Sequence, residues 1–226
     1  NGGVLYTSRG GHIDMDHLRI AVDEVPRFAR KSKEVILNHG KTFALDYESS
    51  LVQIDIEYPK DWENLNREEK TKISEDVSVD IGEYASFHET TWHEAATWFG
   101  YKTYGIFPEF HSSFSWEDMY SNTLGANIGA LACRDKKHPY NESVTLLINE
   151  KLRSLGAQSK ETARIAGEKM KGRWYDENLL IFGFTDMKRR NFDVGLDDGC
   201  VTPWLVPSVG EYGNPAPFPL PVPKLD

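Results

Sequence analysis

Two glutamates, Glu94 and Glu109, stand fifteen positions apart in a stretch dominated by aromatic residues, WHEAATWFGYKTYGIFPEFHSSFSWEDMYSN (92–122). The residues between them include one base, Lys102. Two carboxyl groups in such surroundings can carry out glycoside hydrolysis. One of them, kept protonated, gives its proton to the leaving oxygen. The other, ionised, stabilises the cationic transition state, attacks it or activates water.

The aromatic residues are concentrated around this pair, since twelve of the 27 in the chain fall between Tyr84 and Tyr120. Aromatic side chains desolvate a carboxyl group and so raise its pKa, and their flat faces can stack on sugar rings. The alternative is that these rings form the hydrophobic core while both glutamates are solvated, because glutamate is rarely buried. Clustering of both features in a base-poor stretch favours the catalytic interpretation.

The acidic residues are concentrated in the same region. The chain carries a net charge of −9, from 26 basic and 35 acidic residues. Between Ile73 and Cys133 there are nine acidic residues, and Lys102 is the one basic residue. Such a negative field attracts cations and repels polyanions. Nucleic-acid binding, which needs lysine and arginine against phosphates, is therefore not expected.

The length of 226 residues suits one compact domain, which we place at residues 1–202, followed by a proline-rich extended tail at 203–226. We expect a monomer. No apolar run approaches the roughly 18 residues of a membrane span. Cys133 and Cys200 fit either a disulfide or two buried thiols, and the sequence leaves both open.

Local patterns predict a mainly α fold with a small β region (α+β). Asp14 or Asp16 can cap the first helix, Pro26 is expected to kink or split it, and Gly82 could interrupt the long central one. We expect helices over residues 14–40, 66–99, 115–132, 142–156 and 159–175. We expect β-hairpins over residues 41–58 and 190–206, the second turning at Asp198-Gly199.

The segments WHEAATWFGY (92–101) and PEFHSSFSWEDMYSN (108–122) resemble a family of bacterial envelope proteins, formerly of unknown function, in the lysozyme superfamily. The family includes a lysozyme of predatory bacteria that is specific for deacetylated peptidoglycan. The resemblance covers about residues 92–125, and GGHID near the start fits it more loosely. It implies a modified lysozyme-like fold and two catalytic glutamates, which correspond here to Glu109 as the acid and Glu94 as the base or electrostatic partner.

The resemblance also implies an activity: a secreted or periplasmic muramidase that cleaves deacetylated peptidoglycan without a cofactor. Removing the acetyl group from glucosamine leaves an ammonium group, which an acidic cleft would attract. Tyr120 is expected as a third catalytic residue that hydrogen-bonds near the glutamates. Substrate contacts are expected from Trp92, His93, Tyr101, Tyr104, His111, Ser113, Trp116 and Asp118.

Two other functions remain open at this point. A zinc-dependent hydrolase could use His88, Glu89 and His93 together with His12, because Glu89 and His93 share one helical face. The spacing of these residues is not the His-Glu-x-x-His pattern of zinc proteases. The other function is a non-catalytic module that binds cell-wall glycan. The sequence also leaves open whether a glycosidase would retain or invert the configuration of the sugar.

Overall fold

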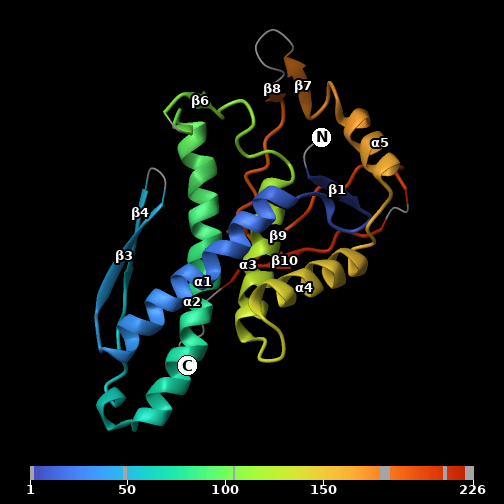
Figure 1. The fold of residues 1–226 in the computed structure, drawn as a ribbon. Helices are drawn as coiled ribbons and strands as arrows, with labels where there is room; N and C mark the ends of the chain where they lie inside the picture. Colours follow the sequence, from blue (N-terminus) through green and yellow to red (C-terminus); the bar gives the residue numbers. More distant parts are fainter. Residues whose placement is uncertain (1–2, 48–49, 104, 179–183, 211–212, 222–226) are drawn as a thin grey trace.

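The computed structural model describes residues 3–47, 50–103, 105–178, 184–210 and 213–221 (Figure 1). The helices are α1 (Met15–Leu37), α2 (Arg67–Trp98), α3 (Asp118–Arg134), α4 (Tyr140–Ser154) and α5 (Lys160–Met170), with a 3₁₀ turn, η1 (Trp62–Asn64). The strands pair as antiparallel hairpins β1 (Val4–Thr7) with β2 (Gly11–Asp14), β3 (Thr42–Tyr47) with β4 (Ser50–Asp55), β5 (Lys102–Thr103) with β6 (Phe107–Pro108), and β7 (Tyr175–Asn178) with β8 (Phe184–Met187). The expected mainly α class with a small β region is confirmed.

Helices α1, α2 and α3 form the core (Figure 1). Buried apolar side chains from all three meet there, including Leu18, Val22, Val25, Phe87, Met119, Leu124 and Ile128. Two glycines let the backbones touch. A Cβ on Gly125 of α3 would lie 2.2 Å from the carbonyl oxygen of Leu18, and one on Gly82 of α2 would lie 2.6 Å from that of Val25. Since no side chain fits at these distances, α1 can lie directly against both neighbours.

The start of α1 is fixed by its cap. The Asp14 carboxylate accepts the backbone N–H groups of Asp16 and His17, at 2.7 and 3.3 Å, which satisfies two donors that the helix leaves unpaired. The backbone N–H of Asp14 in turn donates to the hydroxyl of Ser121 on α3, at 2.9 Å. Pro26 lies inside α1 without splitting it, and α2 continues through Gly82.

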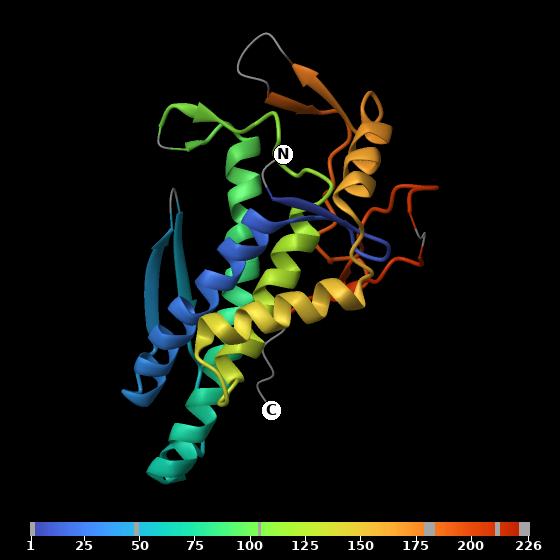
Figure 2. The ribbon, with the colours of Figure 1, turned by 45° about the vertical axis from the view of Figure 1, so that its right-hand side comes forward.

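The β-hairpins lie around this core, with β3–β4 on one side of α1 and α4 and α5 on the other (Figure 2). The predicted hairpin β3–β4 is confirmed, with Thr42 paired to Asp55 and Tyr47 to Ser50. The hairpin predicted to turn at Asp198-Gly199 is wrong. The strand that follows that turn, β9 (Cys200–Val201), pairs instead with β10 (Phe218–Pro219).

The described part of the predicted tail, residues 203–210 and 213–221, packs on the rest of the chain, with turns and bends at 207–210 and strand β10 at Phe218–Pro219. Val206 and Val209 are buried in a cluster with Tyr6 and Trp174. Among the described helices, none has both the length and the apolar composition needed to cross a bilayer. Cys133 and Cys200 are free thiols.

Candidate active site

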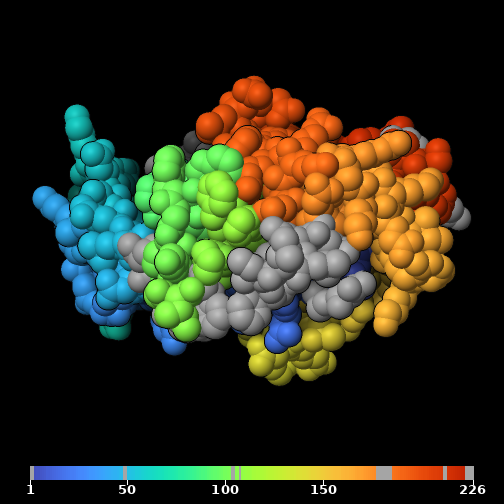
Figure 3. All heavy atoms as spheres, turned by 90° about the horizontal axis from the view of Figure 1, so that it is seen from above, coloured from blue at the N-terminus to red at the C-terminus, as the bar shows by residue number. Residues whose placement is uncertain are grey.

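A cleft of about 1100 Å³ opens where α1 begins and α2 ends. Its walls come from the first turn of α1, the last turns of α2, the segment 109–118, helix α5 and the β7–β8 hairpin. Seen from above (Figure 3), the segment after α2, in green, lies beside the darker orange region that begins at β8, and α5, in lighter orange, lies farther to the right. Backbone N–H groups of Met187 and Asn191 donate to the carbonyls of His111 and Phe114, at 2.9 and 2.8 Å. These bonds join segments that are distant in the sequence.

Glu94, in the last turns of α2, lines this cleft and is only 3% exposed. Its carboxyl group accepts the backbone N–H of Phe114 at 2.7 Å. Phe114 adopts a left-handed backbone conformation, with φ of 55°, which is uncommon for a bulky residue. Burial and then the charge of Asp118 raise the pKa of Glu94 to about 8, against the opposing effect of His17. Glu94 therefore keeps its proton at neutral pH and can act as an acid.

Glu109 enters the cleft from the segment that follows β6. Its side chain is 36% exposed, and its carboxyl oxygen lies 3.2 Å from Nε2 of His93 on α2. The backbone N–H groups of Ser112 and Ser113 both donate to the Glu109 carbonyl at 3.0 Å, which fixes the turn that carries the residue. A solvent-exposed carboxyl group beside an imidazole is suited to act in its ionised form.

His17 lies between Glu94 and Asp118. Its Nδ1 is 3.7 Å from a carboxyl oxygen of Glu94, and its Nε2 is 3.6 Å from one of Asp118. Burial lowers the pKa of His17, but the charges of Asp118 and then Glu94 outweigh it and raise the pKa to about 9. Asp118 also accepts the backbone N–H and the hydroxyl of Ser115, at 2.8 and 2.9 Å. A cation therefore sits between two acids.

The inner wall of the cleft is formed by Trp116, which is itself buried. Its ring stacks on Tyr175 with centroids 5.4 Å apart and meets His12 edge-on at 5.7 Å. Burial lowers the pKa of His12 to about 4, so this imidazole is neutral. Burial, reinforced by Asp118, raises the pKa of the neighbouring Glu117 to about 8.

Some of the residues expected to contact substrate meet in the cleft and others do not. Those that line it are His93, Ser113, Trp116 and Asp118, together with Glu94 and Glu109. Trp92, Tyr101 and His111 are not among the described lining residues: Trp92 is 56% exposed on α2, and His111 is paired with Asp186. Tyr104 lies outside the described residues.

Tyr120, expected near the glutamates, is a core residue. It is 1% exposed, and its hydroxyl donates to the carbonyl of Ala216 at 2.9 Å. It follows Asp118 by two positions on α3, which turns it about 200° around the helix axis. Asp118 therefore faces the cleft and Tyr120 faces away from it.

Sequence reasoning missed His17 and Glu117 as site residues, and also the wall formed by α5 and the β7–β8 hairpin. The Asp14 cap places His17 in the first turn of α1, which the sequence could indicate. That this turn meets Glu94 depends on helix packing, for which the sequence carries no local signal.

The residues considered as zinc ligands, His12, His88, Glu89 and His93, do not form a ligand group within the described part of the chain. Glu89, for example, lies 3.6 Å from Arg27 of α1.

Among the residues that the structure describes, potential ligand atoms of His17, Glu94 and Asp118 do come within 4.8 Å of one another. However, His17 presents one ring nitrogen to each acid. The three side chains therefore also contact one another directly, with the imidazole between the two carboxyl groups.

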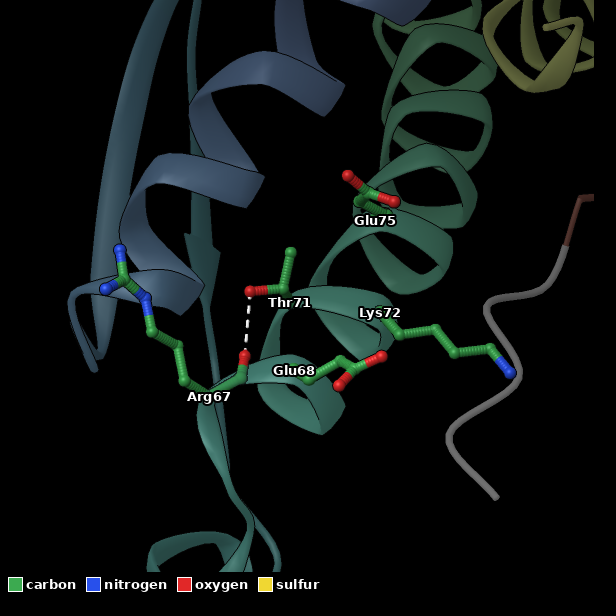
Figure 4. A pocket seen from close by; sticks show the side chains of 5 residues that line it. All are labelled: Arg67, Glu68, Thr71, Lys72 and Glu75. Carbon is green, nitrogen blue, oxygen red and sulfur yellow. Dashed lines mark hydrogen bonds between the residues drawn. The ribbon is translucent and has the colours of Figure 1, made fainter.

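A second hollow lies at the start of α2, far along the helix from Glu94 (Figure 4). It is lined by Arg67, Glu68, Thr71, Lys72 and Glu75. The Arg67 and Lys72 side chains extend to opposite sides of the helix, the Thr71 hydroxyl donates to the Arg67 carbonyl at 2.8 Å, and Glu75 is paired with Lys33. Its charged groups do not converge on one point, so the cleft is the better candidate site.

The buried ionisable groups of the cleft make stability depend on pH. The folded-state pKa values of Glu94 and Glu117 (about 8) and of His17 (about 9) exceed their ordinary values of 4.5 and 6.5. The folded chain therefore holds protons that the unfolded chain has lost, and stability falls as pH rises. Below pH 6.5 His12 opposes this trend, because its folded-state pKa is lowered to about 4.

We expect the free energy of unfolding to fall between pH 6.5 and 9, steepest below pH 8, by up to roughly 1.4 kcal/mol per pH unit for each group. Urea unfolding at a series of pH values measures the effect. Glu117→Gln removes one of the three groups and should flatten the dependence. A stability that is constant across this range, or that rises with pH, would contradict the expectation.

The fold and the cleft together define the class of the protein: a mainly helical α+β protein with a cleft lined by several acidic side chains. The chain belongs to the family described as Protein of unknown function (DUF4056), whose model matches residues 1–201. That range includes every cleft residue named above. No curated protein and no solved structure matches the chain.

Proposed function

We propose that the protein is a glycoside hydrolase that cleaves the glycan strands of peptidoglycan outside the cytoplasm, with Glu94 and Glu109 as its catalytic carboxyl groups. The observation that carries the proposal is that, among the glutamates lining one cleft, Glu94 and Glu109 have opposite environments. Glu94 is buried and protonated, whereas Glu109 is partly exposed beside His93. Different environments of this kind separate the acid from its partner carboxylate in glycosidases.

In this mechanism Glu94 is the general acid. It protonates the glycosidic oxygen, because burial holds its proton at neutral pH. Glu109 stabilises the positive charge that develops on the sugar, attacks its anomeric carbon or activates water. These roles are the reverse of those expected from the sequence, where Glu109 was the acid.

The charge of the cleft supports a deacetylated substrate. Among the described lining residues eight are acidic, and with Glu94 and Glu117 protonated the other six face three cations, His17, Lys160 and Arg164. Arg164 is already paired with Glu161 and Glu168. An ammonium group close to one carboxylate at the protein surface gains up to about 4 kcal/mol, and less after salt screening. A glucosamine ammonium therefore binds more favourably here than a neutral acetamide.

The test is turnover of acetylated and chemically deacetylated sacculi, followed by the release of reducing ends. We expect faster cleavage of the deacetylated wall, and a smaller preference at high ionic strength because salt screens the attraction. Equal rates on both walls would remove the proposed substrate. A preference that does not respond to salt would remove its electrostatic explanation.

The reducing-end assay also distinguishes the proposed hydrolase from a glycan-binding module and from a metal-dependent hydrolase. Binding to the wall without release of reducing ends would identify a glycan-binding module. Loss of turnover in a chelator, restored by added zinc, would identify a metal-dependent hydrolase. The configuration of the first product, followed by NMR, distinguishes retention from inversion.

A further inference from the structure

His17 is held in the cleft by the packing of α1 rather than by its own side chain alone. The residue after it, Leu18, presents its carbonyl to Gly125 of α3 at a distance that excludes any side chain. The residue three positions before it, Asp14, caps the helix and is bonded to Ser121. The His17 backbone is therefore fixed on both sides, with the ring 26% exposed toward the cleft.

The ring joins three helices at one point. His17 comes from α1, Glu94 from α2 and Asp118 from α3, and the two ring nitrogens contact one acid each, at 3.7 and 3.6 Å. Asp118 is in turn held by two hydrogen bonds from Ser115. The contact with Glu94 is thus the end of a chain of interactions that begins at the start of α3.

The other charged residues near His17 have interactions of their own. Asp14 and Glu117 add to the negative field around His17. His93, on the same helix as Glu94, contacts Glu109. The guanidinium of Arg190 donates to the carbonyls of Ser113 and Phe110. The charges of His93 and Arg190 also act on Glu94. His17 contacts the Glu94 carboxyl and a second acid, Asp118, together.

We propose that His17 is a positioning residue for Glu94: its imidazole spans from Asp118 to Glu94 and fixes the orientation of the Glu94 carboxyl in the cleft. The proposal rests on the function proposed above, in which Glu94 gives a proton to the leaving oxygen. A second effect accompanies the positioning. The His17 cation opposes the rise in the pKa of Glu94 that burial and Asp118 cause, so the proton can be released.

The experiment compares His17→Ala and His17→Asn with wild type on deacetylated glycan strands. We expect kcat to fall about 10- to 100-fold with KM little changed, because a misplaced acid affects the chemical step more than binding. The basic limb of the kcat–pH profile should move to higher pH. Added imidazole should restore part of the activity of His17→Ala, since the ring opens onto the cleft. His138→Ala is the matched control, because His138 also pairs with a carboxylate, Asp135, but lies away from the cleft.

A titration followed by ¹³C NMR of the Glu94 carboxyl gives a readout that needs no turnover. We expect its pKa to rise in His17→Asn. An unchanged Glu94 titration in the folded variant, or wild-type kcat and pH profile in both variants, would overturn the proposal and leave the proposed hydrolase intact. Absence of turnover in wild type would instead overturn the proposed function, and the titration would still decide whether His17 acts on Glu94.

Discussion

Glu94→Gln is expected to lower kcat by about 10²- to 10⁴-fold, which is the range for loss of a general acid. Glutamine keeps the size of the side chain and the oxygen that accepts the Phe114 N–H, so the fold should persist. It cannot supply a proton to the leaving oxygen. Stability above neutral pH should increase, because the variant no longer keeps a carboxyl group that must stay protonated in the fold.

The matched control for Glu94→Gln is a substitution of a second glutamate on α2. Glu83 is also on α2, burial raises its pKa, and its carboxyl accepts a hydrogen bond from Asn127 at 3.0 Å. It does not line the cleft, so Glu83→Gln should keep wild-type turnover. Equal loss in the two variants would point to a structural effect, and full activity in Glu94→Gln would remove the mechanism.

Substitution of Glu109 should have a different effect from substitution of Glu94, because the Glu109 side chain is partly exposed. Glu109→Ala leaves a space open to solvent, into which a small anion such as azide can enter and replace the missing carboxylate. We therefore expect azide to rescue Glu109→Ala and not Glu94→Gln. This contrast separates the two roles without relying on the size of either defect.

The sequence could predict the helices because their signals are local. Asp14 caps α1, and Asn66 caps α2 in a capping box with Glu69. The pairing of β9 with β10 is not local, since it joins Cys200 to Pro219 across most of the C-terminal segment. The acidic turn before Cys200 therefore suggested a hairpin that the chain does not form.

The site residues likewise fall into those that a local sequence signal reveals and those that only helix packing brings together. Glu94 and Glu109 could be found because two acids among aromatic residues stand out within one stretch. His17 lies 77 positions before Glu94, and its contact depends on glycines that let α1 approach α3. The position of Tyr120 has a related cause: its side of α3 is set by packing, not by its closeness in sequence to Asp118.

Gly125→Ala tests whether the position of His17 depends on the close approach of α1 to α3. A Cβ there would lie 2.2 Å from the Leu18 carbonyl oxygen and 2.9 Å from the Cβ of Ala21, so α1 and α3 must move apart. Overpacking of this kind costs about 3 kcal/mol or more, against a gain of at most about 1 kcal/mol from helix propensity. For a chain of this size, a net loss of about 2 kcal/mol or more should lower the midpoint of thermal unfolding by at least about 4–8 °C.

Gly167→Ala provides the matched control, since Gly167 is also in a helix and a Cβ there meets nothing within 4 Å. The same chemical change should raise stability by up to about 1 kcal/mol at that position. Because Leu18 follows His17 directly, separating α1 from α3 also draws the imidazole away from Asp118 and Glu94. Turnover by Gly125→Ala should therefore fall even at temperatures where the variant is fully folded. An unchanged unfolding midpoint would mean that the two helices are not in backbone contact, and the three-helix origin of the cleft would then have to be abandoned.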